Sequence, residues 1–269
     1  MELEKVISVL PEIISNLKVD YVIKNDVIRD DIFSILEKHC TVIYYPIKDE
    51  DNCGFHIKRM VNGTKQDFVY INTAKPLPKQ VFTAAHELGH VWCVVAKAEG
   101  LLKETIPPNM EEDIINRFAA ELLMPEAGFV RAFWAHLSTV SKEKKAIRLD
   151  EMVRVMVMQM NDFLVPYEAV RRRMIEVKIL NERTAESLRK NQTVIDNLIA
   201  AFSNDLNTTL DTSTNKMTIP GLRDLIEEKS KTQNVSYYTL KRISEDFNVV
   251  DVNPSEDMIN LISGGRDDV

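Results

Sequence analysis

Hydrophobic residues recur at helical spacing along most of this 269-residue chain, and one interval near residues 41–72 alternates like a strand instead. Apolar positions three and four residues apart predict a helix over residues 2–17, interrupted near Pro11, and a second helix over residues 26–40. Both segments precede the alternating interval. The pattern therefore predicts a mostly helical chain with a small sheet in its N-terminal third.

Three short segments in the alternating interval have strand character. Residues 41–45 are β-branched and aromatic, residues 54–60 alternate, and residues 67–72 form a third run. The pair Asn62-Gly63 lies between the second and third segments and is typical of a tight hairpin turn. We expect a small antiparallel sheet, so the fold class is α+β.

Helical periodicity returns after Pro76 and Pro78, which indicate a loop. The helix that follows is expected to end near Gly100. The next helix begins after Asn109, which we interpret as its N-cap, and stops at Pro125. Shorter helical patterns follow at residues 128–136, at residues 149–180 as two helices around a turn at 161–166, and at residues 222–226 and 237–247.

The chain becomes more polar after about residue 180, and this change in composition predicts two structural regions. Residues 1–180 contain the sheet and end in a helical pair whose outline resembles a helix-turn-helix. Residues 181–269 are more polar and form a helical accessory region. Within it, residues 204–216 are rich in Asn, Thr and Asp and read as a linker, and an acidic, flexible tail begins at Asp251.

Candidate chemistry is concentrated in the helix after Pro78, where His86, Glu87 and His90 form an H-E-x-x-H pattern. Residues four apart lie on the same helical face, so both imidazoles can bind one metal ion. Glu87 projects from a neighbouring direction, where it can act as a base toward a metal-bound water. The surrounding helix is apolar, and unpaired His and Glu side chains are costly in a core. This pattern favours a catalytic zinc site.

A third protein ligand is expected for such a site. Cys93 follows His90 on the same helix and is better explained as a small core residue. Glu112 is the better candidate, because Asn116 lies one turn later and can accept the free ring N–H of a ligating His. Glu111 heads a neighbouring apolar stripe and stays an alternative, since Glu112 could instead complete a capping box. Glu121 lies opposite Glu112 on the helical wheel and is expected to be exposed.

Overall composition narrows the class of protein. The net charge of −7 argues against nucleic-acid binding through the whole surface. The three cysteines form no C-x-x-C pair, which favours a reducing compartment. The N-terminus is charged and amphipathic, and no apolar run approaches the ~18–20 residues that span a bilayer. We expect a cytoplasmic protein that does not bind membranes.

Residues 131–180 carry ten Lys or Arg against six Asp or Glu. Nucleic-acid contact through Arg171, Arg172 and Arg173 is one interpretation. A structural helical pair with a solvated basic face is the interpretation we prefer. Direct nucleic-acid binding is therefore not expected.

Three segments together resemble one family of metallopeptidases. These are Ile71-Asn72, F-T-A-A-H-E-L-G-H at residues 82–90, and E-D-I-I-N-R-F-A-A-E-L-L-M-P at residues 112–125. The combination resembles the ImmA/IrrE family over about residues 25–180. The resemblance implies a zincin-like fold that binds one Zn²⁺ per chain through His86, His90 and Glu112, with Glu87 as the base and Asn116 behind the ligands. Ile115 departs from the Ala that is frequent in the family, and residues after about 181 have no match.

The resemblance also implies a function, namely limited proteolysis of a DNA-binding repressor, often of helix-turn-helix type, in a phage, mobile-element or stress-response setting. Glu87 would take a proton from water and deliver it to the leaving amine. His136 and Tyr70 are candidate stabilisers of the transition state. Residues 68–72 could be an edge strand along which an extended substrate lies.

A second hypothesis belongs to a different class. In it the protein is a regulatory binding protein whose metal site is structural or weakly active. The helical region would then bind DNA or a repressor stoichiometrically.

Overall fold

The computed structural model describes residues 3–49, 51–141, 147–232, 235–247 and 249. The acidic tail predicted from Asp251 lies outside these residues. In the described part, helices alternate with one small sheet, and their order and bounds are α1 Leu3–Ile7, α2 Leu10–Asp20, α3 Asp31–Glu37, β1 Thr41–Tyr45, β2 Gly54–Val61, β3 Thr64–Asn72, α4 Leu77–Val91, α5 Val94–Leu102, α6 Glu111–Leu123, α7 Glu126–Val140, α8 Leu149–Phe163, α9 Tyr167–Glu176, α10 Glu182–Lys190, α11 Gln192–Asp205, α12 Leu222–Thr232 and α13 Tyr237–Asp246.

The sheet has three strands in the order β1-β3-β2. β1 pairs with β3 in parallel and β2 pairs with β3 antiparallel, so the sheet is mixed rather than fully antiparallel. The predicted α+β class, mostly helical with a small sheet, is confirmed. The predicted edge role of residues 68–72 is wrong, because these residues belong to the central strand and are paired on both sides.

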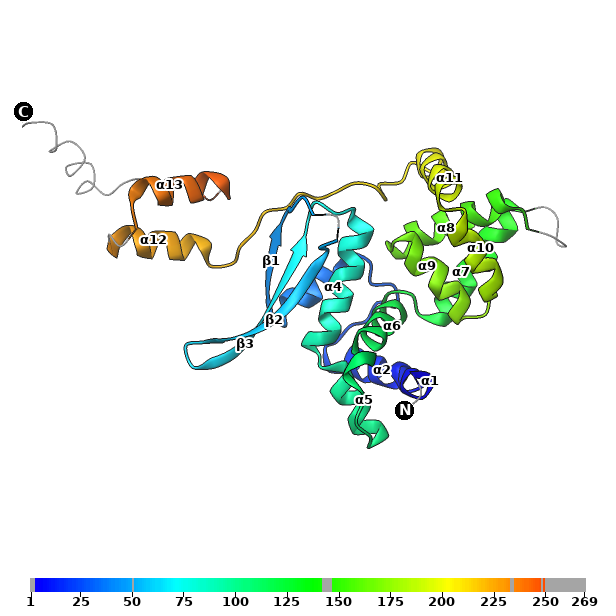
Figure 1. Cartoon of the computed structure of the whole chain (residues 1–269), viewed down its shortest axis with the longest axis horizontal. Helices are drawn as coiled ribbons and strands as arrows, with labels where there is room; N and C mark the ends of the chain where they lie inside the picture. Colours follow the sequence, from blue (N-terminus) through cyan, green and yellow to red (C-terminus); the bar gives the residue numbers. More distant parts are fainter. Residues whose placement is uncertain (1–2, 50, 142–146, 233–234, 248, 250–269) are drawn as a thin grey trace, which may run out of the picture.

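β2 and β3 form a hairpin that projects away from the helices (Figure 1). The turn is at Asn62-Gly63, as its residue types predict, and both residues have positive φ (50° and 76°). Val61 pairs with Thr64 directly across this turn. Strand alternation places Gly54, His56 and Lys58 on the face of β2 toward α4, since a Cβ on Gly54 would meet Thr83 of α4 at 2.6 Å.

α4 covers one face of the sheet through contacts with β2 and β3. The helix does not continue to Gly100 as expected. It ends at Val91, Cys93 adopts a left-handed conformation (φ 52°), and α5 begins at Val94. The break turns the chain within three residues. α5 and α6 then pack against each other beside α2.

Residues 212–218, which include the end of the predicted linker at 204–216, are bound to the sheet and to the start of α4. Thr218 and Tyr44 exchange two backbone hydrogen bonds of 3.0 and 2.9 Å at the free edge of β1. The Leu77 amide at the start of α4 donates to Thr212 O at 2.8 Å. The side chain of Lys216 lies 3.8 Å from the centre of the Tyr44 ring. We call residues 212–218 the strap.

The helices α7, α8, α9 and α11 pack as a group, and α10 contacts α9 and α11. The helical pair predicted within residues 149–180 is present as α8 and α9. Its predicted solvated basic face is wrong for two of its three arginines, because Arg171 and Arg173 are buried at 7% and 0% exposure. Lys142, Lys144 and Lys145, which contribute to the basic composition, lie outside the described residues.

α12 and α13 pack against each other, and Ile226 and Leu240 are buried in them. The Phe247 ring, just after α13, lies 5.2 Å from that of Tyr45 at the end of β1. The division of the chain near residue 180 stays a prediction. In the described part of the chain, no helix combines the length and apolar character needed to cross a bilayer.

Candidate metal centre

Helix α4 presents His86 and His90 one turn apart on the same face. Their side chains are mostly buried, at 16% and 17% exposure. Apolar neighbours on α4, such as Ala84, Ala85 and Leu88, have no exposed surface and anchor the helix in the core. The two rings therefore have little freedom to turn away from each other.

Helix α6 crosses α4 at Gly89, which lies between the two histidines. A Cβ at this position would meet Phe118 at 3.0 Å and Ile115 at 3.2 Å. The absence of a side chain allows the two helices to approach closely, and Ile115, which departs from the frequent Ala of the family, fills that contact at 1% exposure. This crossing brings the first turn of α6 next to the imidazoles.

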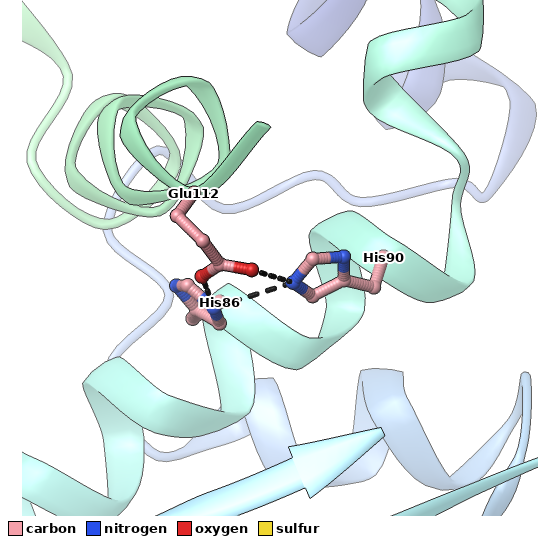
Figure 2. A group of neighbouring side chains, drawn as sticks. All are labelled: His86, His90 and Glu112. Atoms are coloured by element: carbon pink, nitrogen blue, oxygen red, sulfur yellow. Dashed lines mark hydrogen bonds and ion pairs between the residues drawn. The ribbon is translucent and has the colours of Figure 1, made fainter. Parts of the chain in front are cut away.

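Glu112 reaches from α6 toward both rings, as Figure 2 shows. Its Oε2 is 3.2 Å from His86 Nε2, and its Oε1 is 3.6 Å from His90 Nε2. The two Nε2 atoms are 3.3 Å apart. Two ligands of a tetrahedral zinc ion with bonds of about 2.0–2.1 Å lie about 3.3 Å apart. The two imidazole nitrogens thus have the separation that zinc requires, and one carboxylate oxygen of Glu112 lies near each of them.

The other nitrogen of each ring has its own partner. His86 Nδ1 is 3.1 Å from Asn116 Oδ1, and His90 Nδ1 is 3.4 Å from Glu111 Oε1. Because amide and carboxylate oxygens accept hydrogen bonds, these partners suit a proton on the Nδ1 of each ring and leave the Nε2 lone pairs for a metal ion. The donor set fits a metal ion.

The electrostatic environment of His86 favours the neutral form of its imidazole. Burial, followed by the charge of His90, lowers the pKa of His86, whereas Glu112 and Asn116 oppose this shift. A lowered pKa keeps the imidazole neutral at physiological pH. A neutral ring is the form that binds a metal.

Glu87 is next to the cluster and is 6% exposed. Burial raises its pKa to about 7, and the negative charge of Glu112 adds to the shift. No hydrogen-bond partner of its carboxylate lies among the described residues, so this group is free to bind water or substrate. A carboxyl group with a pKa near neutrality can both accept and release a proton.

Of the sequence-predicted residues, the structure brings His86, His90 and Glu112 together, with all donor atoms within 4.8 Å of one another. Asn116 lies behind His86. Tyr70 is elsewhere, on the sheet face away from α4, and its hydroxyl donates to Tyr45 O at 2.9 Å.

His136 is also away from the cluster. Its Nε2 is 2.6 Å from Asp162 Oδ2, so it joins α7 to α8. The structure therefore gives no support for Tyr70 or His136 as a transition-state stabiliser.

Sequence reasoning missed a third histidine close to the cluster. The His56 ring on β2 lies parallel to that of His90, with centroids 6.1 Å apart. Its Nε2 is held by Asp67 Oδ1 of β3 at 2.6 Å. The alternation of β2 was visible in the sequence, but its proximity to α4 arises only from the fold.

Comparisons with known proteins agree with this geometry. Residues 37–174 match the family described as the IrrE N-terminal-like domain, Peptidase_M78. This is about half of the chain and contains both the H-E-x-x-H helix and α6, so the chain belongs to the IrrE N-terminal-like, M78 peptidase family. The predicted ImmA/IrrE resemblance is confirmed.

One solved structure to which this chain is similar is described as a Mycobacterium tuberculosis transcriptional regulator. It has 14% sequence identity and a TM-score of 0.41, and the match covers 65% of this chain and 52% of that one. This chain therefore matches about half of that protein's length. No curated protein sequence matches this chain.

Proposed function

We propose that this protein is a zinc-dependent endopeptidase that cuts a protein substrate at a limited number of sites. The observation that carries the proposal is the position of Glu87. This buried carboxyl, with a pKa of about 7, has no bonding partner among the described residues and lies next to a donor set spaced for zinc. A purely structural metal site needs no such group.

In this proposal His86, His90 and Glu112 hold the ion, and Glu111 and Asn116 orient the two rings. When bound, zinc supplies Lewis acidity, which polarises a carbonyl and makes a nearby water more acidic. Glu87 accepts a proton from the attacking water and delivers it to the nitrogen of the leaving amine. Its raised pKa suits both transfers, because the same group must be a base first and an acid afterwards.

The substrate chain is proposed to bind along β2. β1 is covered by the strap and β3 is central, whereas the outer side of β2 has no strand beside it in the described part of the chain. The backbone N–H of Asn72 donates to Cys53 O at 2.9 Å. In an antiparallel pair, every second residue after Cys53 is hydrogen-bonded to β3, and the residues between them are not. The backbone N–H and C=O groups of Gly54, His56 and Lys58 therefore point outward. An extended peptide can pair with them and pass the metal centre.

A DNA-binding repressor of helix-turn-helix type is the proposed substrate. This choice rests on the family resemblance at residues 82–90 and 112–125. The competing hypothesis, stoichiometric DNA binding through the helical region, is weakened because Arg171 and Arg173 are buried. Arg173 in particular is enclosed by carboxylates and cannot reach a phosphate.

The test is incubation of the zinc-loaded protein with a repressor encoded beside its gene, with Glu87→Gln as the matched variant. We expect the wild type to cleave the repressor and a chelator to stop the reaction. Glu87→Gln should keep its zinc and lose at least about 100-fold in rate, because it removes the base and leaves the ligands. Cleavage products are measured by mass spectrometry and zinc by elemental analysis.

Cleavage by Glu87→Gln at the wild-type rate would refute the assigned role. Equal loss of zinc in Glu87→Gln and His86→Ala would do the same. Duplex binding at submicromolar affinity with steep salt dependence, together with no cleavage, would favour the regulatory alternative.

A further inference from the structure

The β2–β3 hairpin carries an exposed surface that the proposed chemistry does not use. Phe55, Ile57 and Met60 on β2 are 46%, 36% and 67% exposed. Arg59 lies between Ile57 and Met60 on β2, and Lys65 lies opposite Met60 on β3. Both are exposed. We call these five residues the hairpin surface. Figure 1 shows that the outer part of the hairpin extends beyond the neighbouring helices, and among the described residues no helix is seen to cover it.

The charge of the hairpin differs from that of the whole chain. Residues 54–67 contain three Lys or Arg and one carboxylate, Asp67, whereas the chain has a net charge of −7. Asp67 is engaged by His56 at 2.6 Å and by Lys58 at 3.5 Å. Arg59 and Lys65 have no acidic partner among the residues that the structure describes. Two free cations therefore accompany the exposed apolar side chains.

Natural proteins usually protect a free strand edge against pairing with other chains. This protein protects one edge of its sheet, because the strap hydrogen-bonds to Tyr44 on β1. β2 is eight residues long and carries neither proline nor a bulge along its pairing with β3. The charged residues Lys58 and Arg59 oppose pairing with basic chains, so this partly apolar edge is open to an acidic extended chain.

The two faces of β2 carry different side chains, one set next to the candidate metal centre and the other on the opposite side of the sheet. His56 and Lys58 face α4, where His56 stacks on His90 and Lys58 Nζ lies 3.7 Å from Cys93 Sγ. Phe55, Ile57 and Arg59 face the opposite side. A peptide added to β2 would place alternate side chains over the metal centre and over this second row.

We propose that the hairpin surface selects the substrate by binding an extended segment that contains both apolar and acidic residues. Phe55, Ile57 and Arg59 lie on one face of the hairpin, and Met60 and Lys65 lie on the other. On each face, apolar residues of the segment cover the apolar side chains and a carboxylate pairs with the cation. This inference rests on the proposed peptidase function, because it assigns a substrate class to the same site. It adds a selection surface at a distance from the three metal ligands.

Binding of two synthetic peptides to zinc-loaded Glu87→Gln protein tests the proposal without requiring catalysis. Both peptides have about ten residues, enough to span β2. They share Val-Leu pairs and carry either Glu-Glu or Lys-Lys pairs between them, so that each face of the extended peptide presents both apolar and charged side chains. By fluorescence anisotropy at low salt we expect the Glu peptide to bind at least about fivefold more tightly, and the preference to shrink as salt is added.

The charge reversal Arg59→Glu with Lys65→Glu should reverse this preference. Both side chains are exposed, so the fold should be retained, as unchanged zinc content would show. The matched control is Arg131→Glu with Arg183→Glu, which changes the net charge equally at exposed positions on α7 and α10 and should keep the wild-type preference. Met60→Ser should weaken binding of both peptides.

Equal binding of the two peptides, no binding of either, or an unchanged preference in the hairpin reversal would overturn the proposal. Failure of the peptidase hypothesis is a separate result, since it would appear as absent repressor cleavage while the peptide preference could still be measured. Reversed peptide preference in the hairpin variant, and not in the control, supports selection by the hairpin surface.

Discussion

Two neighbouring acidic residues at the start of α6 have different positions relative to the histidines, and Glu112 is the one that the sequence favoured as a ligand. Glu112 Oε2 lies 3.2 Å from His86 Nε2, on the metal side of the ring. Glu111 Oε1 lies 3.4 Å from His90 Nδ1, on the opposite side of that ring. Consecutive helical residues point about 100° apart, so in the proposed site one carboxylate would bind the metal and the other would orient a ligand.

This division predicts different losses of metal. Glu112→Ala removes a ligand and should abolish tight zinc binding. Glu111→Ala leaves all three ligands and should weaken zinc binding by only about 10–100-fold, the usual effect of losing a group that orients a ligating histidine. Competition with a chromophoric chelator measures both affinities, and a greater loss in Glu111→Ala would exchange the two roles.

At the scale of elements, the metal centre depends on the link between α6 and α9. Arg173 of α9 is fully buried and forms ion pairs with Glu121 of α6 at 2.5 Å and with Glu176 at 3.1 Å. Its Nε donates to Met124 O at 2.9 Å. Arg117 of α6 also pairs with Glu176. Glu121, which we expected to be exposed, is therefore part of a buried charge network that holds α6 in place.

Replacing Arg173 with Met should destabilise the protein by about 3–5 kcal/mol, because Glu121 loses its buried counter-ion. Arg172→Met on the same helix is the control. Arg172 is 63% exposed and pairs with Glu168 at the surface, so its loss should cost less than about 1 kcal/mol. Urea unfolding measures both values, and similar losses in the two variants would show that the network does not hold α6.

For the whole molecule, residues far apart in sequence complete the three-stranded sheet. The strap lies more than a hundred residues after β1, yet it covers the β1 edge and contacts the start of α4. Thr73 Oγ1 donates to Lys216 O at 2.7 Å, and Thr214 Oγ1 donates to Gln80 Oε1 at 2.9 Å. The part of the chain beyond residue 180 therefore contributes directly to the environment of the metal-binding helix.

Thr218→Pro tests this contribution, because proline lacks the amide that donates to Tyr44 O at 2.9 Å. We expect a loss of about 1–3 kcal/mol in the free energy of unfolding. Thr218→Ala keeps the amide and alters only an exposed side chain, so its effect should be within about 0.5 kcal/mol. A proline variant as stable as the alanine variant would mean that the strap is not a structural part of the sheet.

Local sequence patterns were sufficient to predict several parts of this structure. The spacing of His86 and His90, the Asn62-Gly63 turn and the amphipathic helices each depend on residues within one or two turns of each other. Such features follow from backbone geometry and from the periodicity of apolar side chains. They predicted the fold class, the family resemblance and the two histidines of the candidate site.

The remaining features depend on contacts between distant segments. The α4–α6 crossing at Gly89 turns Glu112 rather than Glu111 toward the two Nε2 atoms, and ion pairs between α9 and α6 enclose Arg173. The strand order, which makes β2 rather than β3 the open edge, is likewise a matter of pairing between segments. The sequence by itself determined which chemical groups this protein has and which helices and strands carry them. The tertiary structure decided which groups meet, because that depends on packing and strand pairing that local periodicity does not encode.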